Sequence, residues 1–349
     1  MSAVAHFSWT GWRANKNFFL VMALYVLAAL SSSVYWKIAI DMQLYSDAFL
    51  LFGFGVTVIL FAVISIRVML ERPPRIYPAL RDRLTVHRLP ERLVVGLPVA
   101  VGLPIFFSLF TSMKGGISRI VPFYADNTLI AVDRAIHGGM DAWQILHPLL
   151  GAGLVTLALN FLYNLWFIVM IVILFCVVFS AGNERLRSQY LVAFVLAWAL
   201  LGNVAAALFS SVGPAFLAAF YSDDSFEPLM SYLRSTDATY PVWALDAQGM
   251  LLANAGLDGP RLGSGISAFP SMHVAVATLN AIYLWRFGSL LRWTSIVFLI
   301  AIQVAAVHLA WHYAIDGYAS MLATPVIWAF AGWMSDIGQQ QRGRPVAAS

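Results

Sequence analysis

Long apolar runs, separated by short polar stretches, dominate the pattern of this chain. Each run approaches the roughly 20 residues that a helix needs to cross the hydrocarbon core of a bilayer. The sixth run is short before Arg286 but can extend back through Pro270, a residue suited to a helix start. The pattern predicts an all-α, polytopic membrane protein with about eight transmembrane helices, of which about six carry the core. The expected spans are residues 17–40, 48–70, 93–112, 153–180, 190–211, 272–285, 294–311 and 317–334.

The composition agrees with a membrane protein. Of the 349 residues, 60% are hydrophobic and 11% are charged, which a soluble core of ordinary size does not need. The formal net charge of +4 is explained by the Lys and Arg residues that set membrane topology, so a nucleic-acid partner is not expected. Cys176 is the single cysteine, which excludes an internal disulfide and a cysteine metal cluster.

Basic residues lie at alternate connections between the apolar runs. Cytoplasmic loops carry the Lys and Arg excess of a membrane protein, so these connections and both termini should be cytoplasmic, while the acidic loops face outward. We therefore divide the chain into two N-terminal helices with a basic loop (1–92), a membrane core (93–335) and a cytoplasmic tail (336–349). The basic residues used are Arg13, Lys16, Arg72, Arg75, Arg81, Arg83, Arg88, Arg92, Arg185, Arg187, Arg286, Arg292, Arg342 and Arg344.

Two predicted external segments, residues 114–151 and 213–267, are long enough to hold structure. The apolar-polar pattern at 126–133 predicts an interfacial helix, ended by the glycine pair that follows it. We expect Asp126 and Asp133 to be solvated acids on this helix, with binding of a polar headgroup as the alternative. The second segment mixes aromatic residues, prolines and acids, a composition that predicts a folded cap against the lipid headgroups.

Two short stretches place ionisable side chains beside apolar runs. Residues 268–273 read Ala-Phe-Pro-Ser-Met-His, and residues 312–316 read His-Tyr-Ala-Ile-Asp. Ionisable groups at the edge of a bilayer are costly to keep there, so a functional site is the default interpretation. The predicted topology brings His273, His312 and Asp316 to the external face of the membrane.

The spacing of His312 and Asp316 suits a nucleophile. If the turn is helical, residues four apart lie on one side, where a carboxylate holds one imidazole nitrogen and raises the basicity of the other. His273 is then available to protonate a leaving group as a general acid.

These stretches resemble two motifs of the type-2 phosphatidic acid phosphatase superfamily. Residues 270–273 resemble its second motif, Pro-Ser-Gly-His, and His312-x-x-x-Asp316 resembles the end of its third motif. The resemblance implies a phosphohistidine mechanism in which His312 attacks phosphorus, Asp316 orients it and His273 protonates the departing oxygen. It implies no metal and no cofactor.

Within that superfamily, the two stretches look most like the inositol phosphorylceramide synthase branch, and His-Tyr-x-x-Asp is also similar to sphingomyelin synthases. Such enzymes transfer a phosphate-bearing headgroup. The resemblance therefore implies a lipid phosphatase or phosphotransferase of the cell membrane. Its partners would be a lipid phosphate in the external leaflet and, for transfer, an acceptor lipid.

The chain departs from the family pattern where cations are expected. The Ser-Arg pair that precedes the third-motif histidine is replaced by Ala305 and Ala306, and residues 210–216 lack the first motif, Lys-x6-Arg-Pro. A phosphoryl group in its transition state needs positioned donors. We expect Lys114 and Arg119 to supply them with Ser271, since glycines beside Lys114 also let backbone amides approach an anion. Weaker alternatives for the cations are Arg234 and Arg261, and an alternative role for Lys114 and Arg119 is contact with lipid headgroups.

Other interpretations of these residues remain open. His308, His312 and Asp316 form a stripe at four-residue intervals that suits a metal site on one helix face. We favour no metal, with His308 hydrogen-bonded in the bundle or near the phosphate and Tyr313 beside it as a supporting residue. His137 and His147 are expected to be structural or interfacial.

Two alternatives for the function are a membrane transporter and a noncatalytic membrane protein that retains the fold. Several spans with histidines would suit a proton relay. No inverted repeat is visible, however, and the ionisable groups cluster at one face. Loss of His312 or Asp316 would have favoured the noncatalytic protein, and both are present.

Overall fold

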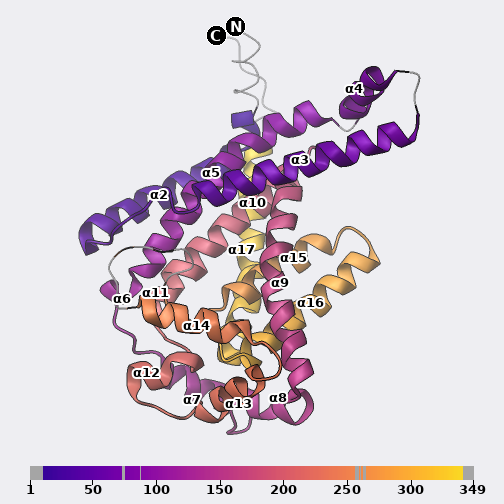
Figure 1. The fold of residues 1–349 in the computed structure, drawn as a ribbon. Helices are drawn as coiled ribbons and strands as arrows, with labels where there is room; N and C mark the ends of the chain where they lie inside the picture. Colours follow the sequence, from indigo (N-terminus) through magenta and orange to yellow (C-terminus); the bar gives the residue numbers. More distant parts are fainter. Residues whose placement is uncertain are drawn as a thin grey trace.

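The computed structural model describes residues 11–72, 75–86, 88–255, 259, 261 and 265–340, and this part of the chain is helical with no strand (Figure 1). The predicted all-α class is confirmed. Arg342 and Arg344, two of the basic residues that predict the membrane topology, lie outside the described residues. The helices are α2 (Lys16–Trp36), α3 (Ser46–Leu70), α4 (Ile76–Val86), α5 (Leu89–Gly115), α6 (Ile117–Ile120), α7 (Asp126–Ile136), α8 (Ala142–Leu150), α9 (Gly153–Val178), α10 (Glu184–Ala199), the π-helical η1 (Leu200–Ala205), α11 (Ala206–Leu208), the 3-10 helix η2 (Pro214–Phe216), α12 (Leu217–Tyr221), α13 (Glu227–Asp237), α14 (Trp243–Asn254), α15 (Met272–Leu284), α16 (Ser289–His308) and α17 (Ala314–Gln340).

Among the described residues, five helical segments are long and apolar enough to cross a membrane: α2, α5, α9, α10 continued to Leu208, and α16. The chain is therefore an integral membrane protein. The count of about eight spans, the cytoplasmic termini and the domain boundaries stay predictions. α3 and α17 have 25 and 27 residues, whereas α15 has only 13 because Ser271 caps it. The expected extension of this helix back through Pro270 is wrong.

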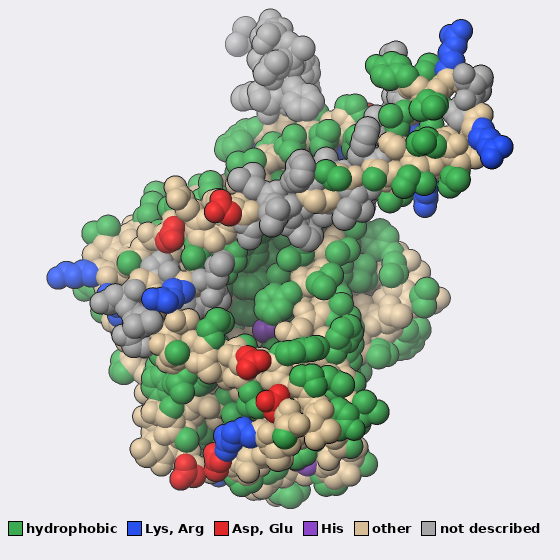
Figure 2. Space-filling model, viewed as in Figure 1, with side chains coloured by type: hydrophobic (Ala, Val, Ile, Leu, Met, Phe, Trp, Pro, Cys, Tyr) green, Lys and Arg blue, Asp and Glu red, His purple; other side chains and the backbone are tan. Residues whose placement is uncertain are grey.

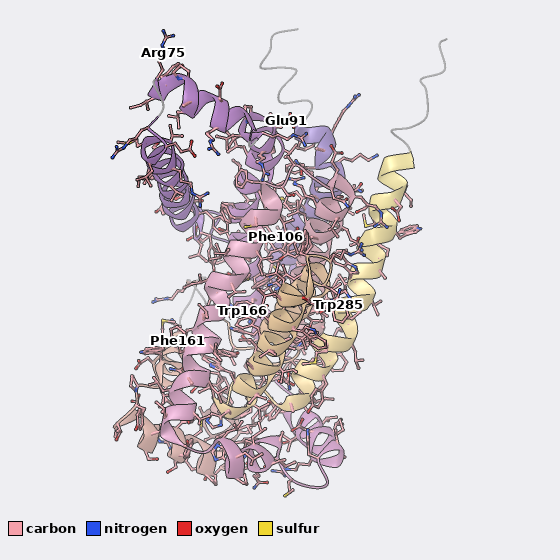
Figure 3. All side chains as sticks on the ribbon, turned by 90° about the vertical axis from the view of Figure 1, so that its right-hand side faces the viewer. Arg75, Glu91, Phe106, Phe161, Trp166 and Trp285 are labelled. Carbon is pink, nitrogen blue, oxygen red and sulfur yellow. The ribbon has the colours of Figure 1, made fainter. Side chains whose placement is uncertain are left out.

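The core is a bundle built around α10, which packs against α2, α9, α15 and α17. Most side chains of α10 are buried, including Tyr190 and Phe194, because its sequence from residue 190 to residue 199 is apolar on all faces. On α9, Trp166 is buried in the bundle while Phe161 is exposed (Figure 3). Exposed apolar residues of this kind suit a protein whose outer surface meets lipid.

The two ends of the helix bundle carry different residues and helices. The side chain of Asn17 at the start of α2 donates to the carbonyl of Met334 near the end of α17, at 3.0 Å. Arg75 and Glu91 lie toward this same end (Figure 3), whereas α7, α8, α12 and α13 gather at the opposite end (Figure 1). Both predicted external segments thus hold helices, as the sequence indicated. α7 begins at Asp126 and ends before Gly138 and Gly139, which both have positive φ.

A buried arginine joins four helical segments at the first of these ends. Arg187 is 4% exposed and donates to the Asn15 side chain at 2.7 Å, to the Val95 carbonyl at 2.8 Å and to the Val178 carbonyl at 3.0 Å. Asn15 precedes α2, Val95 is in α5 and Val178 ends α9, so one side chain satisfies polar groups from all three and ties them to α10.

Replacing Arg187 with alanine is expected to lower the free energy of unfolding by about 3 kcal/mol, because several buried acceptors lose their donor. Thermal unfolding of the purified protein in detergent measures this. The control is Arg185→Ala, which removes the ion pair between Arg185 and Asp336 at the surface. Exposed ion pairs contribute little, so the control should unfold close to the wild type. Equal losses in the two variants would contradict the role of Arg187.

Candidate active site

The two chemistry-bearing stretches meet where the starts of α15 and α17 lie side by side. The backbone N–H of Ser271 donates to the carbonyl of Asp316 at 3.2 Å, and the Ser320 hydroxyl donates to the carbonyl of Ser271 at 2.8 Å. Ser271 is fully buried and its own hydroxyl accepts from the backbone N–H of Val274 at 3.5 Å, as an N-cap of α15. The assigned phosphate contact of Ser271 stays a prediction, and the contact that the structure gives is a helix cap.

His312 and Asp316 form the expected pair. The His312 Nδ1 atom lies 3.2 Å from Asp316 Oδ2, the Asp316 side chain is fully buried and that of His312 is 10% exposed. The same Oδ2 accepts the backbone N–H of Tyr313 at 3.2 Å. Asp316 is the third residue of α17, so this is the bond with which an acidic residue caps a helix start. The hydrogen bond from the Tyr313 N–H orients the carboxylate of Asp316, and this carboxylate in turn orients the imidazole of His312.

The local conformation differs from the helical turn expected from the four-residue spacing. α16 ends at His308, Ala310 has φ of +59°, and α17 begins only at Ala314. His308 lies on the other side of this break, with Nε2 2.8 Å from the Thr156 hydroxyl of α9. His308, His312 and Asp316 therefore do not lie on one helix face, and the alternative of a metal site on such a face is wrong. In the part of the chain that the structure describes, no group of three His, Cys, Asp or Glu residues is placed to hold a metal.

His273 lies in the first turn of α15 between two aromatic rings of α9. The ring centroids of Tyr163 and Trp166 are each 4.2 Å from that of His273, and the Trp166 indole donates to the His273 carbonyl at 2.8 Å. The Tyr163 ring also lies parallel to that of Trp311, with centroids 6.2 Å apart, and Trp311 directly precedes His312. The packing holds the His273 ring in a fixed orientation near the His312–Asp316 pair.

The four candidate cations are placed differently. Gly265, with φ of +100°, lies against Lys114: a Cβ atom at residue 265 would be 2.9 Å from the Lys114 carbonyl oxygen. Lys114 thus lies beside the loop that leads into α15. Arg119 is exposed and donates to the Lys37 carbonyl at 3.2 Å. Exposed Arg234 pairs with Glu227, and Arg261 is exposed.

Asp126 is a site residue whose role the sequence did not reveal. It is 1% exposed, so the expectation of a solvated acid is wrong. Its carboxylate accepts the backbone N–H groups of Val212 and Gly213 at 2.9 Å each, the Tyr313 hydroxyl at 2.9 Å and the Tyr221 hydroxyl at 3.1 Å. Asp126 therefore ties α7 to the second external segment and to the residue that follows His312.

Asp133 is a second buried acid on the same helix, at 4% exposure, and here too the solvated interpretation is wrong. Its Oδ1 accepts the backbone N–H of Ile315 at 2.8 Å. Residues seven apart share one face of a helix, so α7 makes two contacts here: Asp126 with Tyr313 in the loop before α17, and Asp133 with Ile315 in the first turn of α17. We call this pair the α7 acids. The seven-residue spacing of Asp126 and Asp133 was the one feature of the sequence that indicated a shared, buried face.

A pH-dependent stability is expected from Asp133. Burial raises the pKa of its carboxyl, against the Ile315 N–H and His137, which lower it. A carboxyl with a raised pKa in the folded state binds more protons there than in the unfolded chain, so its stabilising contribution is complete below about pH 4 and is lost as pH rises through the folded pKa. Asp133→Asn keeps an acceptor for Ile315 and should lose less stability than the wild type between about pH 4 and pH 8. Thermal unfolding across this range tests it, and parallel profiles would contradict it.

The remaining histidines of the cap are held by packing. His147 packs edge-on against Tyr232 and at a tilt against His308, with ring centroids at 4.5 and 5.1 Å, and burial lowers its pKa. His137 Nδ1 lies 2.7 Å from the Asp133 carbonyl oxygen. These contacts agree with the structural role expected for both. The hydroxyl of Tyr313 donates to Asp126 at 2.9 Å, and the supporting role expected of Tyr313 stays a prediction.

A recess is visible in the face of the molecule shown in Figure 2, below α3 and above α14 in the view of Figure 1. Hydrophobic side chains form its rim, and a histidine side chain is visible inside it. An apolar rim around a polar interior is typical of sites that take amphipathic ligands.

A comparison with family models matches residues 127–330 to the PAP2 superfamily, the type-2 phosphatidic acid phosphatases. The matched region runs from α7 into α17 and contains His273, His312 and Asp316. It covers more than half of the 349 residues. Comparisons with curated proteins and with solved structures gave no match. Because the family model matches more than half of the chain, the chain belongs to the PAP2 superfamily.

Proposed function

We propose that this protein is a membrane-embedded lipid phosphatase or phosphotransferase that works through a phosphohistidine on His312. The observation that carries the proposal is the contact between His312 Nδ1 and the buried carboxylate of Asp316 at 3.2 Å. This contact leaves Nε2 as the ring nitrogen with a lone pair for attack, and a carboxylate partner raises its basicity. Membership of the PAP2 superfamily supports a phosphate ester as the substrate.

The reaction proceeds in two displacements at phosphorus. Nε2 of His312 forms the N–P bond as the P–O bond to the leaving group breaks, and His273 passes a proton to the departing oxygen. An acceptor hydroxyl then gives its proton to His273 and attacks phosphorus, which breaks the N–P bond and restores His312. Asp316 stabilises the positive charge on the ring while the N–P bond exists. No cofactor takes part.

We propose transfer of a phospho-headgroup to an acceptor lipid, rather than hydrolysis, as the main reaction. The likeness of residues 268–273 and 312–316 to inositol phosphorylceramide synthases supports transfer. The charge of the site supports it too: Ala305 and Ala306 are buried where related phosphatases carry Ser-Arg. A site with few cations favours a phosphodiester with one negative charge over a monoester with two, because each uncompensated charge is costly in a low dielectric.

The proposed setting is the external leaflet of the cell membrane. The acidic loops that hold the cap helices support this orientation, because cytoplasmic loops carry the basic excess. The apolar rim of the recess supports a lipid substrate that enters with its acyl chains in the bilayer. The membrane core of residues 93–335 would carry the reaction.

The test is a product analysis with the purified protein in liposomes. Lipids labelled in the phosphate group, one set of monoesters and one of diesters, are incubated with and without ceramide or diacylglycerol as acceptor. Transfer predicts a new labelled lipid that requires the acceptor and arises from a diester. Free phosphate from a monoester, unchanged by acceptor, would instead establish a phosphatase. The absence of any product that depends on His312 would refute the proposed function.

A further inference from the structure

Two neutral donors lie buried beside His273 and His312 without a hydrogen-bond partner among the described residues: the Tyr163 hydroxyl and the Trp311 indole N–H. Tyr163 is 5% exposed. His273 Nε2 and Asp316 Oδ1 are likewise buried and unpaired among the described residues. Buried polar groups of a folded protein are nearly always paired, so a cluster of unpaired groups that includes two neutral donors points to a bound ligand.

The geometry places both donors at the reacting groups. The Tyr163 ring stacks on that of His273, with centroids 4.2 Å apart and planes 18° apart, and lies parallel to that of Trp311 at 6.2 Å and 9°. Trp311 directly precedes His312 in the chain. The three rings therefore form one wall next to the His312–Asp316 pair.

The charge of the site explains why neutral donors are needed there. The chain lacks the Lys-x6-Arg-Pro motif and has Ala305 and Ala306 in place of Ser-Arg. The oxygens of a phosphoryl group gather negative charge as His312 attacks, and this charge needs donors fixed before the reaction. Hydroxyl and indole N–H groups in a dry site meet that need without adding positive charge.

We propose that Tyr163 and Trp311 donate hydrogen bonds to the nonbridging oxygens of the transferred phosphoryl group, in place of the missing cationic ligands. The assignment rests on the proposed function for the identity of that group. It adds two catalytic residues that no motif of the sequence marks. Tyr163→Phe removes only the hydroxyl oxygen, and Trp311→Phe replaces the indole with a phenyl ring that lacks the N–H, so each donor can be removed by one substitution.

The test compares Tyr163→Phe and Trp311→Phe with the wild type by two measurements. The first is binding of orthovanadate, a phosphate analogue, followed by calorimetry on the purified protein. The second is turnover with the labelled lipids, separated into kcat and KM. We expect each variant to bind vanadate about 10-fold more weakly and to lose roughly 100-fold in kcat with KM little changed.

The control is Tyr190→Phe, because the Tyr190 hydroxyl is buried and donates to the Asn280 side chain at 2.7 Å. This variant should lose stability and keep vanadate affinity. Tyr163→Phe should unfold like the wild type, because its hydroxyl donates to no acceptor among the described residues. Trp311→Phe also loses part of the indole packing and should unfold somewhat more easily.

The outcomes separate this inference from the proposed function. Wild-type vanadate affinity in both wall variants, or no vanadate binding by the wild type, would overturn the role of Tyr163 and Trp311 even if His312 carries a phosphoryl group. If Tyr163→Phe and Trp311→Phe both bind vanadate more weakly but the wild type turns over no lipid, the role of the two donors in binding phosphate is supported and the proposed lipid chemistry is rejected.

Discussion

Replacing His312 with alanine is expected to abolish turnover of the lipid phosphate, with a loss in kcat of about 10⁴-fold or more, because no other group supplies the attacking nitrogen. The fold should survive, since the bond of His312 to Asp316 is only one of the contacts that hold this loop. Rates of labelled product formation in liposomes, normalised to folded protein, measure the loss.

The covalent intermediate gives a second measurement on the same variant. Wild-type protein quenched during turnover should carry phosphate that is stable in base and released by acid, as expected of an N–P bond, and His312→Ala should carry none. His147→Ala is the matched control, because it removes a half-buried histidine of α8 whose ring packs against Tyr232 and His308 instead of His273 or His312. Full labelling of His312→Ala would reject the phosphohistidine.

Replacing Asp126 with alanine is expected to cost about 3 to 5 kcal/mol of folding free energy, because it leaves buried donors without their acceptor. The four donors come from three parts of the chain: residues 212 and 213, Tyr221 and Tyr313. Chemical or thermal unfolding in detergent measures the cost. Turnover should fall as well, since Tyr313 adjoins His312.

Two further variants make this prediction specific. Asp126→Asn keeps one acceptor oxygen and should recover part of the stability. Asp224→Ala removes an exposed acid from the same end of the molecule and should have little effect. If Asp126→Ala unfolded like Asp224→Ala, the α7 acids would not hold the catalytic loop.

The fold class could be predicted because helices that span a membrane are recognised in a sequence by their length and their hydrophobicity. The pairing of His312 with Asp316 could be predicted as well, although by a false local model: a helix cap, not a continuous helical turn, brings the two together. The short α15 was less predictable, because its start is set by Ser271 in a loop that is anchored to α17. Helix boundaries of this kind depend on tertiary contacts.

The roles of Asp126 and Tyr163 could not be predicted, for two different reasons. An acid on an amphipathic helix looks solvated until the elements that cover it are known, and the donors to Asp126 lie 86 or more positions further along the chain. An aromatic residue in an apolar span looks like packing, and Tyr163 differs only in that its hydroxyl meets no acceptor. Such information arises from the folded arrangement.

The contacts of α2 limit how far this chain can be shortened without loss of activity. Asn15, Asn17 and Tyr25 bond to Arg187, Met334 and Asn203, respectively, so the first half of α2 is attached to the bundle that contains the family match. Truncation at residue 93 would remove α2 and leave part of α10 bare to lipid. An active minimal enzyme should therefore retain α2, and in any effort to shorten the protein α3 and α4, which project from the bundle, are the segments to remove first (Figure 1).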